Sequence, residues 1–362
     1  MTMQRGKRAK LVIGILLGIL VAFCVISFFA DRAILAQSFS RVDPINMRLS
    51  LTDADIAADY PYTDVEFYSG DTLLRGHVYE PQVDDDARGL LVFVHGIYAQ
   101  HENYLALITA FVDRGWRVFA YDATGCGASE GDSVRGMPQS ALDLHAALSY
   151  IESNGIAQGE TVVVVGHSWG AFATGAALNF DHDVEAAVCM SGFSDSLAIL
   201  DETAQRMFGP IGRTQYPFIY LNNLIDFNEN ASLSAVEGIN HANIPVMVIH
   251  GTDDTVISYD GASISAHADK IANPFVSYIV EDVEGRNGHN SYFYSVESQD
   301  YLDECAAAFL EFAEDYGGVD KVAPEAVSSF RDSIDLKRAN TADPALMDLM
   351  DAFLVQSTMR SL

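Results

Sequence analysis

The chain has 362 residues, 49% of them hydrophobic, which is enough for one large domain or two small ones with a sizeable core. Its formal net charge is −29 at pH 7, and so acidic a surface repels phosphate backbones, which disfavours nucleic-acid binding. Outside the N-terminal apolar segment only Cys126, Cys189 and Cys305 occur, and their irregular spacing fits neither a disulfide framework nor a cysteine zinc motif.

The N-terminus combines a basic leader with an uncharged apolar segment. Residues 1–10 contain four basic residues and no acidic one, and residues 11–30 contain no charged residue. A helix of about twenty residues spans roughly 30 Å, the thickness of the bilayer's hydrocarbon region. A basic leader stays in the cytoplasm, so we expect residues 11–30 to be a single-pass anchor in the cell membrane, with the body of the chain extracytoplasmic. A cleaved signal peptide, which would give a secreted protein, is the alternative.

After this segment the chain reads as a polar connector, residues 31–60, followed by alternating strands and helices. We expect a hairpin of strands at 65–68 and 73–79, strands at 90–94, 117–121, 162–165, 184–190, 244–250 and 275–280, and helices at 102–114, 140–153, 171–178, 261–270 and 292–316. Such alternation is typical of βαβ units. It predicts an α/β domain over residues 61–316, with a mostly parallel sheet, an antiparallel N-terminal edge and helices on both faces.

Two further segments depart from this rhythm. Residues 193–243 are rich in aromatic side chains and are interrupted by Pro210 and Pro217. A structureless loop of that length is uncommon in a compact domain, so we expect a helical cap insertion. It packs against the end of the sheet, covers the site as a lid over an apolar pocket, or does both. The tail, residues 317–362, is predicted to be a helical extension whose apolar stripe contacts the core or a partner.

The strongest motif follows a run of four valines, Val162 to Val165. The next residues, 166–170, read Gly-His-Ser-Trp-Gly, and a helix of small residues follows them. A strand, a sharp turn and a helix around G-x-S-x-G form the context of a nucleophile elbow. The glycines leave room for a tight turn that holds the serine hydroxyl out at the carboxyl edge of the sheet. This pattern predicts Ser168 as a nucleophile.

A serine nucleophile needs a base, and the base needs a carboxylate to orient it. In this context the order along the chain is serine, acid, histidine. Asp254 follows a buried strand and a glycine turn and is the preferred acid, with Asp253 as the alternative. His289 lies in a loop before the last helix, whereas His267, the other histidine after Asp254, falls within a predicted helix. We therefore expect His289 to be the base.

Attack on a carbonyl also requires donors for the oxyanion. The backbone N–H of Trp169, directly after the nucleophile, is one candidate. The other is expected in the turn after the strand that ends at Val94, where Gly96 leaves the N–H of Ile97 facing the site, with Tyr98 as the alternative. The glycine-rich loop at residues 121–131 lacks a third glycine opening a helix, so it argues only weakly for dinucleotide binding.

Taken together, these motifs resemble the α/β-hydrolase superfamily, and most closely its branch of monoacylglycerol-lipase-like esterases and serine aminopeptidases. The resemblance covers roughly residues 62–316 and rests on His95-Gly96, the loop 121–131, Gly166 to Gly170, His250-Gly251-x-x-Asp254 and Gly288-His289. It implies Ser168, Asp254 and His289 as the catalytic triad, Ile97 and Trp169 as oxyanion donors, and neither a metal nor an organic cofactor. Relatives with an aspartate nucleophile act as dehalogenases or epoxide hydrolases, and Ser168 argues against both.

The expected function is therefore a membrane-anchored serine hydrolase that cleaves carboxylic esters through an acyl-enzyme. The aromatic insertion favours a small-molecule substrate with an apolar acyl group. One alternative is a peptidase of the aminopeptidase type, which needs an acidic group to hold the free amine of its substrate. Another is a catalytically silent fold that binds partners at the membrane surface.

Overall fold

The computed structural model describes residues 2–43, 49–82, 88–157 and 159–359. Its described strands form one eight-stranded sheet in the order β1-β2-β4-β3-β5-β6-β7-β8. The strands are β1 (Tyr62–Ser69), β2 (Thr72–Tyr79), β3 (Leu90–Val94), β4 (Arg117–Tyr121), β5 (Val162–His167), β6 (Ala186–Met190), β7 (Val246–Gly251) and β8 (Val276–Glu281). β1 and β2 form the predicted hairpin, β2 also pairs antiparallel with β4, and the remaining pairs are parallel.

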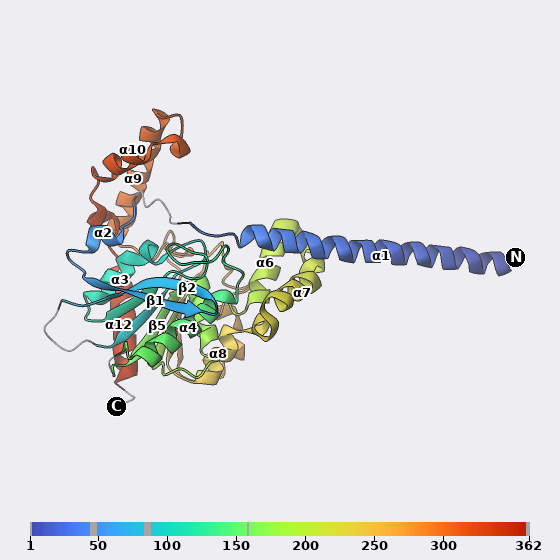
Figure 1. The fold of residues 1–362 in the computed structure, drawn as a ribbon, viewed down its shortest axis with the longest axis horizontal. Coiled ribbons are helices and arrows are strands. Elements are labelled where there is room, and N and C mark those ends of the chain that lie inside the picture. Colours follow the sequence, from blue (N-terminus) through green and yellow to red (C-terminus); the bar gives the residue numbers. More distant parts are fainter. Residues whose placement is uncertain (1, 44–48, 83–87, 158, 360–362) are drawn as a thin grey trace.

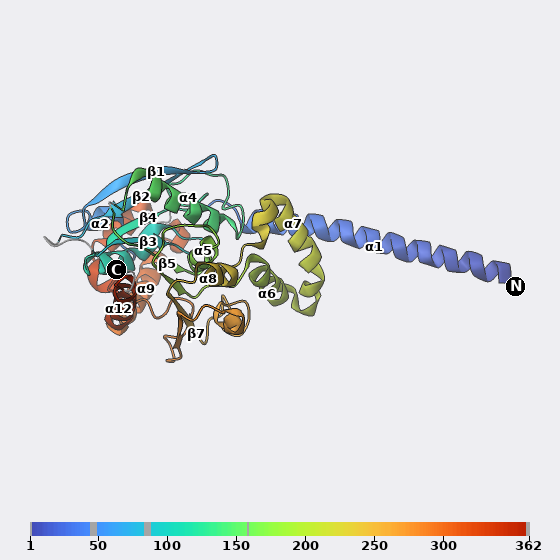
Figure 2. The same cartoon turned by 90° about the horizontal axis from the view of Figure 1, so that it is seen from below.

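Helices cover both faces of this sheet (Figures 1 and 2). The α-helices are α1 (Thr2–Ser38), α2 (Asp53–Ile56), α3 (Leu105–Val112), α4 (Gln139–Asn154), α5 (Trp169–Ala177), α6 (Ser196–Phe208), α7 (Tyr216–Phe227), α8 (Ala235–Ala242), α9 (Val296–Glu314), α10 (Pro324–Arg331), α11 (Leu336–Ala339) and α12 (Pro344–Thr358). The 3-10 turns are η1 (His101–Tyr104), η2 (Gly209–Gln215), η3 (Asn228–Ser232), η4 (Ser265–Lys270) and η5 (Val319–Lys321).

The sheet divides the core into two layers, because successive side chains of a strand point to opposite faces. Val162 and Val164 of β5 pack with α4, α5 and α8, while Val163 and Val165 pack with α3 and α12. The apolar stripe of α12 thus belongs to the core, and Trp116 Nε1 donates a 2.8 Å hydrogen bond to Asp351 on the same helix. Both faces of the sheet are covered, so β5 is buried at the centre of the sheet. The next residue, Ser168, therefore lies at the carboxyl edge of the sheet.

The N-terminal helix is longer than its apolar segment. The apolar run was expected to end at Ala30 and give way to a polar connector, but α1 continues as one helix to Ser38. It extends away from the body at its N-terminal end and lies beside α7 of the insertion at its C-terminal end (Figures 1 and 2). The part from Lys10 to Ser38 is long and apolar enough to cross a membrane.

The predicted insertion is helical, as α6, α7 and α8 with the turns η2 and η3. The helix predicted at 261–270 is wrong, since only the 3-10 turn η4 forms there. Side chains of the segment take interior backbone groups that a helix would need. The N–H of Ala266 donates to Ser263 Oγ and the His267 ring contacts the Ser263 carbonyl, each at 2.9 Å, and the His267 backbone is not helical. Such local contacts compete with the i→i−4 hydrogen bonds of a helix.

Candidate active site

Ser168 lies between β5 and α5 in a strained turn. Its φ is +57° and its ψ is −115°, a backbone conformation that residues other than glycine rarely adopt, and the residue is only 5% exposed. The flanking glycines are required by space: a Cβ on Gly166 would lie 2.3 Å from the Gly170 carbonyl oxygen, and one on Gly170 would lie 2.1 Å from that of Val94. The sequence prediction of a sharp strand-to-helix turn at this serine is therefore met in the geometry.

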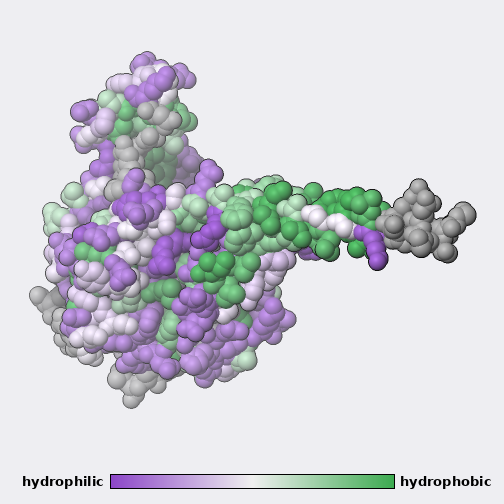
Figure 3. Space-filling view, turned by 45° about the vertical axis from the view of Figure 1, so that its right-hand side comes forward, coloured by the Kyte–Doolittle hydropathy of each residue, from purple (hydrophilic) through white to green (hydrophobic). Residues whose placement is uncertain are grey.

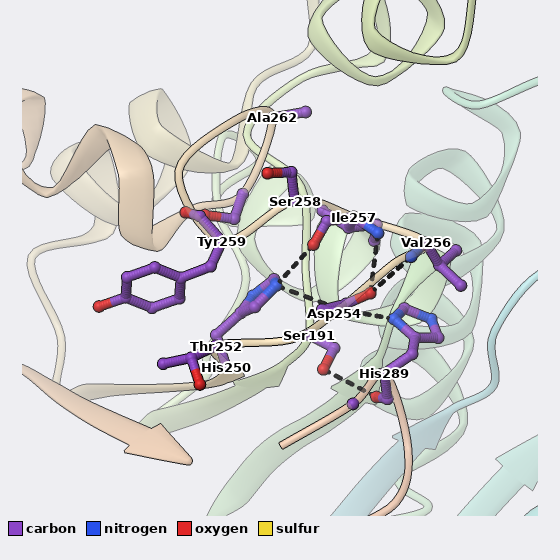
Figure 4. Close-up of polar contacts among 12 residues, drawn as sticks. Ser191, His250, Thr252, Asp254, Val256, Ile257, Ser258, Tyr259, Ala262 and His289 are labelled. Carbon is purple, nitrogen blue, oxygen red and sulfur yellow. Dashed lines mark hydrogen bonds and ion pairs between the residues drawn. The ribbon is translucent and has the colours of Figure 1, made fainter. Parts of the chain in front are cut away.

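Asp254 and His289 are in contact, as the sequence predicted. His289 Nδ1 lies 2.7 Å from Asp254 Oδ2, and because a carboxylate only accepts, the ring donates from Nδ1 and leaves Nε2 free to act as a base (Figure 4). Asp254 Oδ1 accepts from the N–H groups of Val256 and Ile257 at 2.8 and 2.9 Å. Asp253, the alternative acid, is exposed.

His250 is a second partner of Asp254 that the sequence did not single out by itself. Its Nε2 lies 3.2 Å from Asp254 Oδ2 and 3.0 Å from the Ile257 carbonyl oxygen, and the residue is fully buried. Burial alone raises the pKa of Asp254, but the hydrogen bonds from His250 and His289 outweigh it and hold that pKa well below its usual range. Asp254 is therefore an ionised carboxylate whose position is fixed from several sides.

A buried hydrogen-bond relay joins the turn at Ser168 to the loop of His289. The Gly96 N–H donates to the Tyr104 hydroxyl at 3.0 Å, and that hydroxyl donates to His167 Nδ1 at 2.8 Å. His167 Nε2 donates to the backbone carbonyl of His289 at 3.1 Å, which also accepts from Ser191 Oγ at 2.8 Å. Burial lowers the pKa of His167 well below its usual value, so the ring stays neutral, as this donor–acceptor pattern requires.

The relay lies where the segments that carry Ser168 and His289 meet at one edge of the sheet. The rings of His167 and His289 have centroids 4.7 Å apart. Among the hydrogen bonds of the described residues, none joins Ser168 Oγ to His289. Such bonds are often long before a substrate binds. Sequence reasoning gave no role to Tyr104, His167 or Ser191. His167 lies within the G-x-S-x-G motif, but that motif specifies only the serine and the glycines, and no motif marks the other two.

The two predicted oxyanion donors flank the serine. A Cβ on Gly96 would lie 3.4 Å from Ser168 Cβ, so the turn that carries Ile97 runs directly beside Ser168. In the described part of the chain, the backbone hydrogen bonds give neither Ile97 N–H nor Trp169 N–H an acceptor. The alternative, Tyr98, has a half-exposed side chain that donates to the Ser38 carbonyl of α1 at 2.6 Å.

Ser168 opens into an apolar pocket with a volume of about 280 Å³. The insertion provides one wall, including Ile199, Leu200, Met207, Phe208 and Ile219, and α1 provides another through Ile34, Leu35 and Ser38. The insertion therefore does line a pocket at the serine, as predicted for a lid. The wall from α1 was not predicted.

Several contacts hold α1 against this pocket. Arg32 forms an ion pair with Asp226 of α7 at 3.0 Å, and Asn222 donates to the Phe28 carbonyl at 3.3 Å. Figure 3 shows that the hydrophobic surface of α1 continues onto the neighbouring part of the body. On the insertion the exposed apolar side chains are Met207, Phe208, Ile211, Tyr216, Tyr220, Leu221, Leu224 and Ile225.

One acidic side chain also lines the pocket. Asp31 of α1 is 7% exposed, and its Oδ2 is buried without a hydrogen-bond partner among the described residues. A buried polar atom without a partner costs free energy, which a substrate that donates a hydrogen bond would recover.

The glycine-rich loop at 121–131 has a structural role. Asp122 accepts from the N–H groups of His101 and Ala128 at 2.9 and 2.8 Å, and a Cβ on Gly127 would lie 2.1 Å from Asp122 Oδ2. The glycines thus let the loop close around a carboxylate. Dinucleotide binding has no support in this arrangement.

Comparisons with known proteins agree with the fold. Residues 85–228 match the family described as serine aminopeptidase, S33. No curated protein matches the chain. Among solved structures, esterase Pf2001 of Pyrococcus furiosus is similar with a TM-score of 0.52 and 20% identity, over 76% of this chain and 98% of that one.

Two other solved structures are similar at lower TM-scores. Esterase Est1E of Butyrivibrio proteoclasticus, with bound ferulic acid, has a TM-score of 0.45 and 15% identity over 62% of this chain and 90% of that one. An acylaminoacyl peptidase of Pyrococcus horikoshii has a TM-score of 0.47 and 19% identity over 64% of this chain and 38% of that one. Its sheet topology, the match over residues 85–228 and the similarity to esterase Pf2001 together show that the chain has the α/β-hydrolase fold.

Proposed function

We propose that this protein is a serine hydrolase that cleaves carboxylic esters through an acyl-enzyme. The observation that carries the proposal is the His289–Asp254 contact of 2.7 Å at the same sheet edge as the strained Ser168. His289 Nε2 takes the proton of the Ser168 hydroxyl as its oxygen attacks the ester carbonyl. The N–H groups of Ile97 and Trp169 stabilise the oxyanion. Collapse expels the alcohol, which receives the proton from His289, and a water activated by His289 releases the acid.

We further propose that residues 11–30 remain as an uncleaved membrane anchor, with residues 1–10 cytoplasmic, residues 31–60 connecting, and a hydrolase domain over 61–316 carrying a cap at 193–243 and an extension at 317–362. Signal cleavage near residues 30–36 would remove or release the segment of α1 that lines the pocket and pairs with Asp226. The catalytic domain is then extracytoplasmic. The apolar lining supports an apolar acyl group as the preferred substrate part.

A second function has one specific observation in its favour. An aminopeptidase needs an acid to hold the substrate's ammonium group, and the acidic sequence offers too many candidates to choose from. The unpartnered carboxylate of Asp31 in the pocket of Ser168 is such an acid. The two functions are distinguished by whether the site cleaves aminoacyl amides or neutral esters.

One experiment separates these functions and the catalytically silent alternative. The full chain and its Ser168→Ala variant, purified in detergent, are treated with a fluorophosphonate probe and then given short-chain esters, long-chain esters and aminoacyl amides. We expect labelling that depends on Ser168 and a higher kcat/KM for long acyl esters. Amide turnover above ester turnover would support the peptidase, and absent labelling would point to a binding protein. Equal kcat/KM for acetyl and long acyl esters would refute the acyl preference.

A further inference from the structure

Three segments far apart in the chain bring a carboxylate and two imidazoles together on the β2 side of the molecule. Asp53 belongs to α2, His77 to β2 and His101 to η1. Asp53 Oδ2 lies 3.0 Å from His101 Nε2 and 3.3 Å from His77 Nε2, and the three ligand atoms lie within 4.8 Å of one another. The two Nε2 atoms thus converge on one carboxylate oxygen.

Each imidazole has a second carboxylate behind it. His101 Nδ1 lies 2.7 Å from Asp122 Oδ1, and His77 Nδ1 lies 3.0 Å from Asp64 Oδ1. The other oxygen of Asp53 accepts from the Tyr79 hydroxyl. Histidines that bind a metal usually donate their remaining ring N–H to a carboxylate, which fixes the ring and directs the free nitrogen at the ion. His101 has that arrangement, and His77 Nδ1 has a carboxylate oxygen at the same range without an ordinary hydrogen-bond geometry.

A proton on His101 explains only part of this cluster. An imidazolium at His101 would bridge Asp53 and Asp122 and satisfy both ring nitrogens. His77 stays unexplained, because its Nδ1 is buried without a hydrogen bond of ordinary geometry and its Nε2 reaches Asp53 only as an ion-pair distance. Three carboxylates, those of Asp53, Asp64 and Asp122, surround the two rings. These carboxylates would therefore balance the charge of a cation bound by both Nε2 atoms.

We propose that Asp53, His77 and His101 bind a divalent transition-metal ion, with Zn²⁺ as the preferred ion. In tetrahedral zinc sites with bonds of about 2.0–2.1 Å, neighbouring ligand atoms lie about 3.3 Å apart, close to the 3.0 and 3.3 Å measured from Asp53 Oδ2. Two imidazole nitrogens favour zinc over Mg²⁺ or Ca²⁺, which prefer oxygen ligands. A cavity of about 340 Å³ borders His77 and His101 and admits a water as fourth ligand.

The ion has a structural role at this position. It joins α2, which lies outside the segment matched to the family, to η1, which follows the turn carrying Ile97. The site uses neither Ser168 nor His289, so this inference does not depend on the proposed hydrolase function.

The test uses the full chain in detergent, purified with an affinity tag that contains no histidine. The protein is equilibrated with micromolar Zn²⁺ and passed through gel filtration in metal-free buffer. The amount of zinc per chain is then measured by elemental mass spectrometry. Replacement by Co²⁺ then reports the geometry through visible absorption. We expect one zinc per chain and a tetrahedral Co²⁺ spectrum. A wild-type chain that retains no zinc would overturn the proposal and leave the His101 proton bridge as the explanation.

Variants locate the ion. His77→Gln is expected to lose stoichiometric zinc, with circular dichroism to check folding. Asp64→Asn changes a largely exposed side chain and should weaken zinc affinity about 10–100-fold, as loss of a carboxylate behind a metal-binding histidine typically does. His145→Gln is the matched control, since His145 pairs with His182 at 2.7 Å outside the cluster, and it should keep one zinc. Full zinc in both His77→Gln and Asp64→Asn would overturn the site.

Discussion

Replacement of Asp254 by asparagine tests the proposed acid most directly, and the structure predicts how the amide would sit. Asp254 Oδ1 accepts from the N–H groups of Val256 and Ile257, so the amide oxygen stays there, since turning it away would leave the buried Ile257 donor unpaired at about 1–3 kcal/mol and would also break the part-buried bond from Val256. The amide NH₂ then faces His289 Nδ1. That nitrogen must become an acceptor, and the proton moves to Nε2, where the base is needed.

The expected loss of activity is large. A triad histidine held in the wrong tautomer lowers kcat about 10⁴-fold in serine proteases, which corresponds to about 5.5 kcal/mol at 1.36 kcal/mol per factor of ten. The assay is kcat and KM on a chromogenic long-chain ester, with fluorophosphonate labelling of Ser168 as a second readout. KM should change little, because Asp254 does not line the pocket.

Asp253→Asn is the matched control, one residue away but exposed. A surface substitution of this kind changes free energies by about 0.5 kcal/mol, so kcat should stay within about twofold. A large loss in Asp253→Asn with normal activity in Asp254→Asn would show that the wrong acid was chosen. Normal activity in both variants would refute the triad.

Three further predictions concern stability. Tyr104→Phe leaves the Gly96 N–H and His167 Nδ1 without their shared hydroxyl, which should lower the free energy of unfolding by about 1–3 kcal/mol in denaturant titrations, whereas an unchanged value would contradict the relay. Because the pKa of buried His167 is lowered, this ring takes a proton only on unfolding. The free energy of unfolding should therefore fall as the pH drops below about 6.5, by up to about 1.4 kcal/mol per pH unit. His167→Gln should reduce that slope, and an equal slope in the variant would refute the role of His167. Gly170→Ala would place a Cβ 2.1 Å from the Val94 carbonyl oxygen and should lower the free energy of unfolding by at least about 1–3 kcal/mol, with a lower melting temperature. Gly14→Ala is the control: its Cβ would meet no atom within 4 Å, so the melting temperature should stay unchanged.

Sequence patterns predicted the sheet and its edge because those signals are local. The buried strands at 90–94 and 117–121 match β3 and β4 residue for residue. Parallel strands carry residues that are far apart in the chain to one edge of the sheet. The order of the motifs was therefore enough to predict that Asp254 and His289 lie close together. The relay through Tyr104 and His167 has no such signal, since G-x-S-x-G leaves the residue before the serine unspecified and neither residue reveals its partner. The helix expected at 261–270 does not form, because the Ser263 hydroxyl and the His267 ring bind interior backbone groups of that segment.

The role of α1 shows what hydropathy alone misses. The apolar run ends where Asp31 and Arg32 begin, which reads as the boundary between an anchor and a connector. Backbone propensity gives a different answer, since residues 33–36, Ala-Ile-Leu-Ala, include strong helix formers and nothing there breaks the helix. The two charged side chains face the body of the protein: Arg32 pairs with Asp226 of the insertion, and Asp31 lines the pocket. One continuous helix therefore joins the apolar segment to the pocket wall beside Ser168.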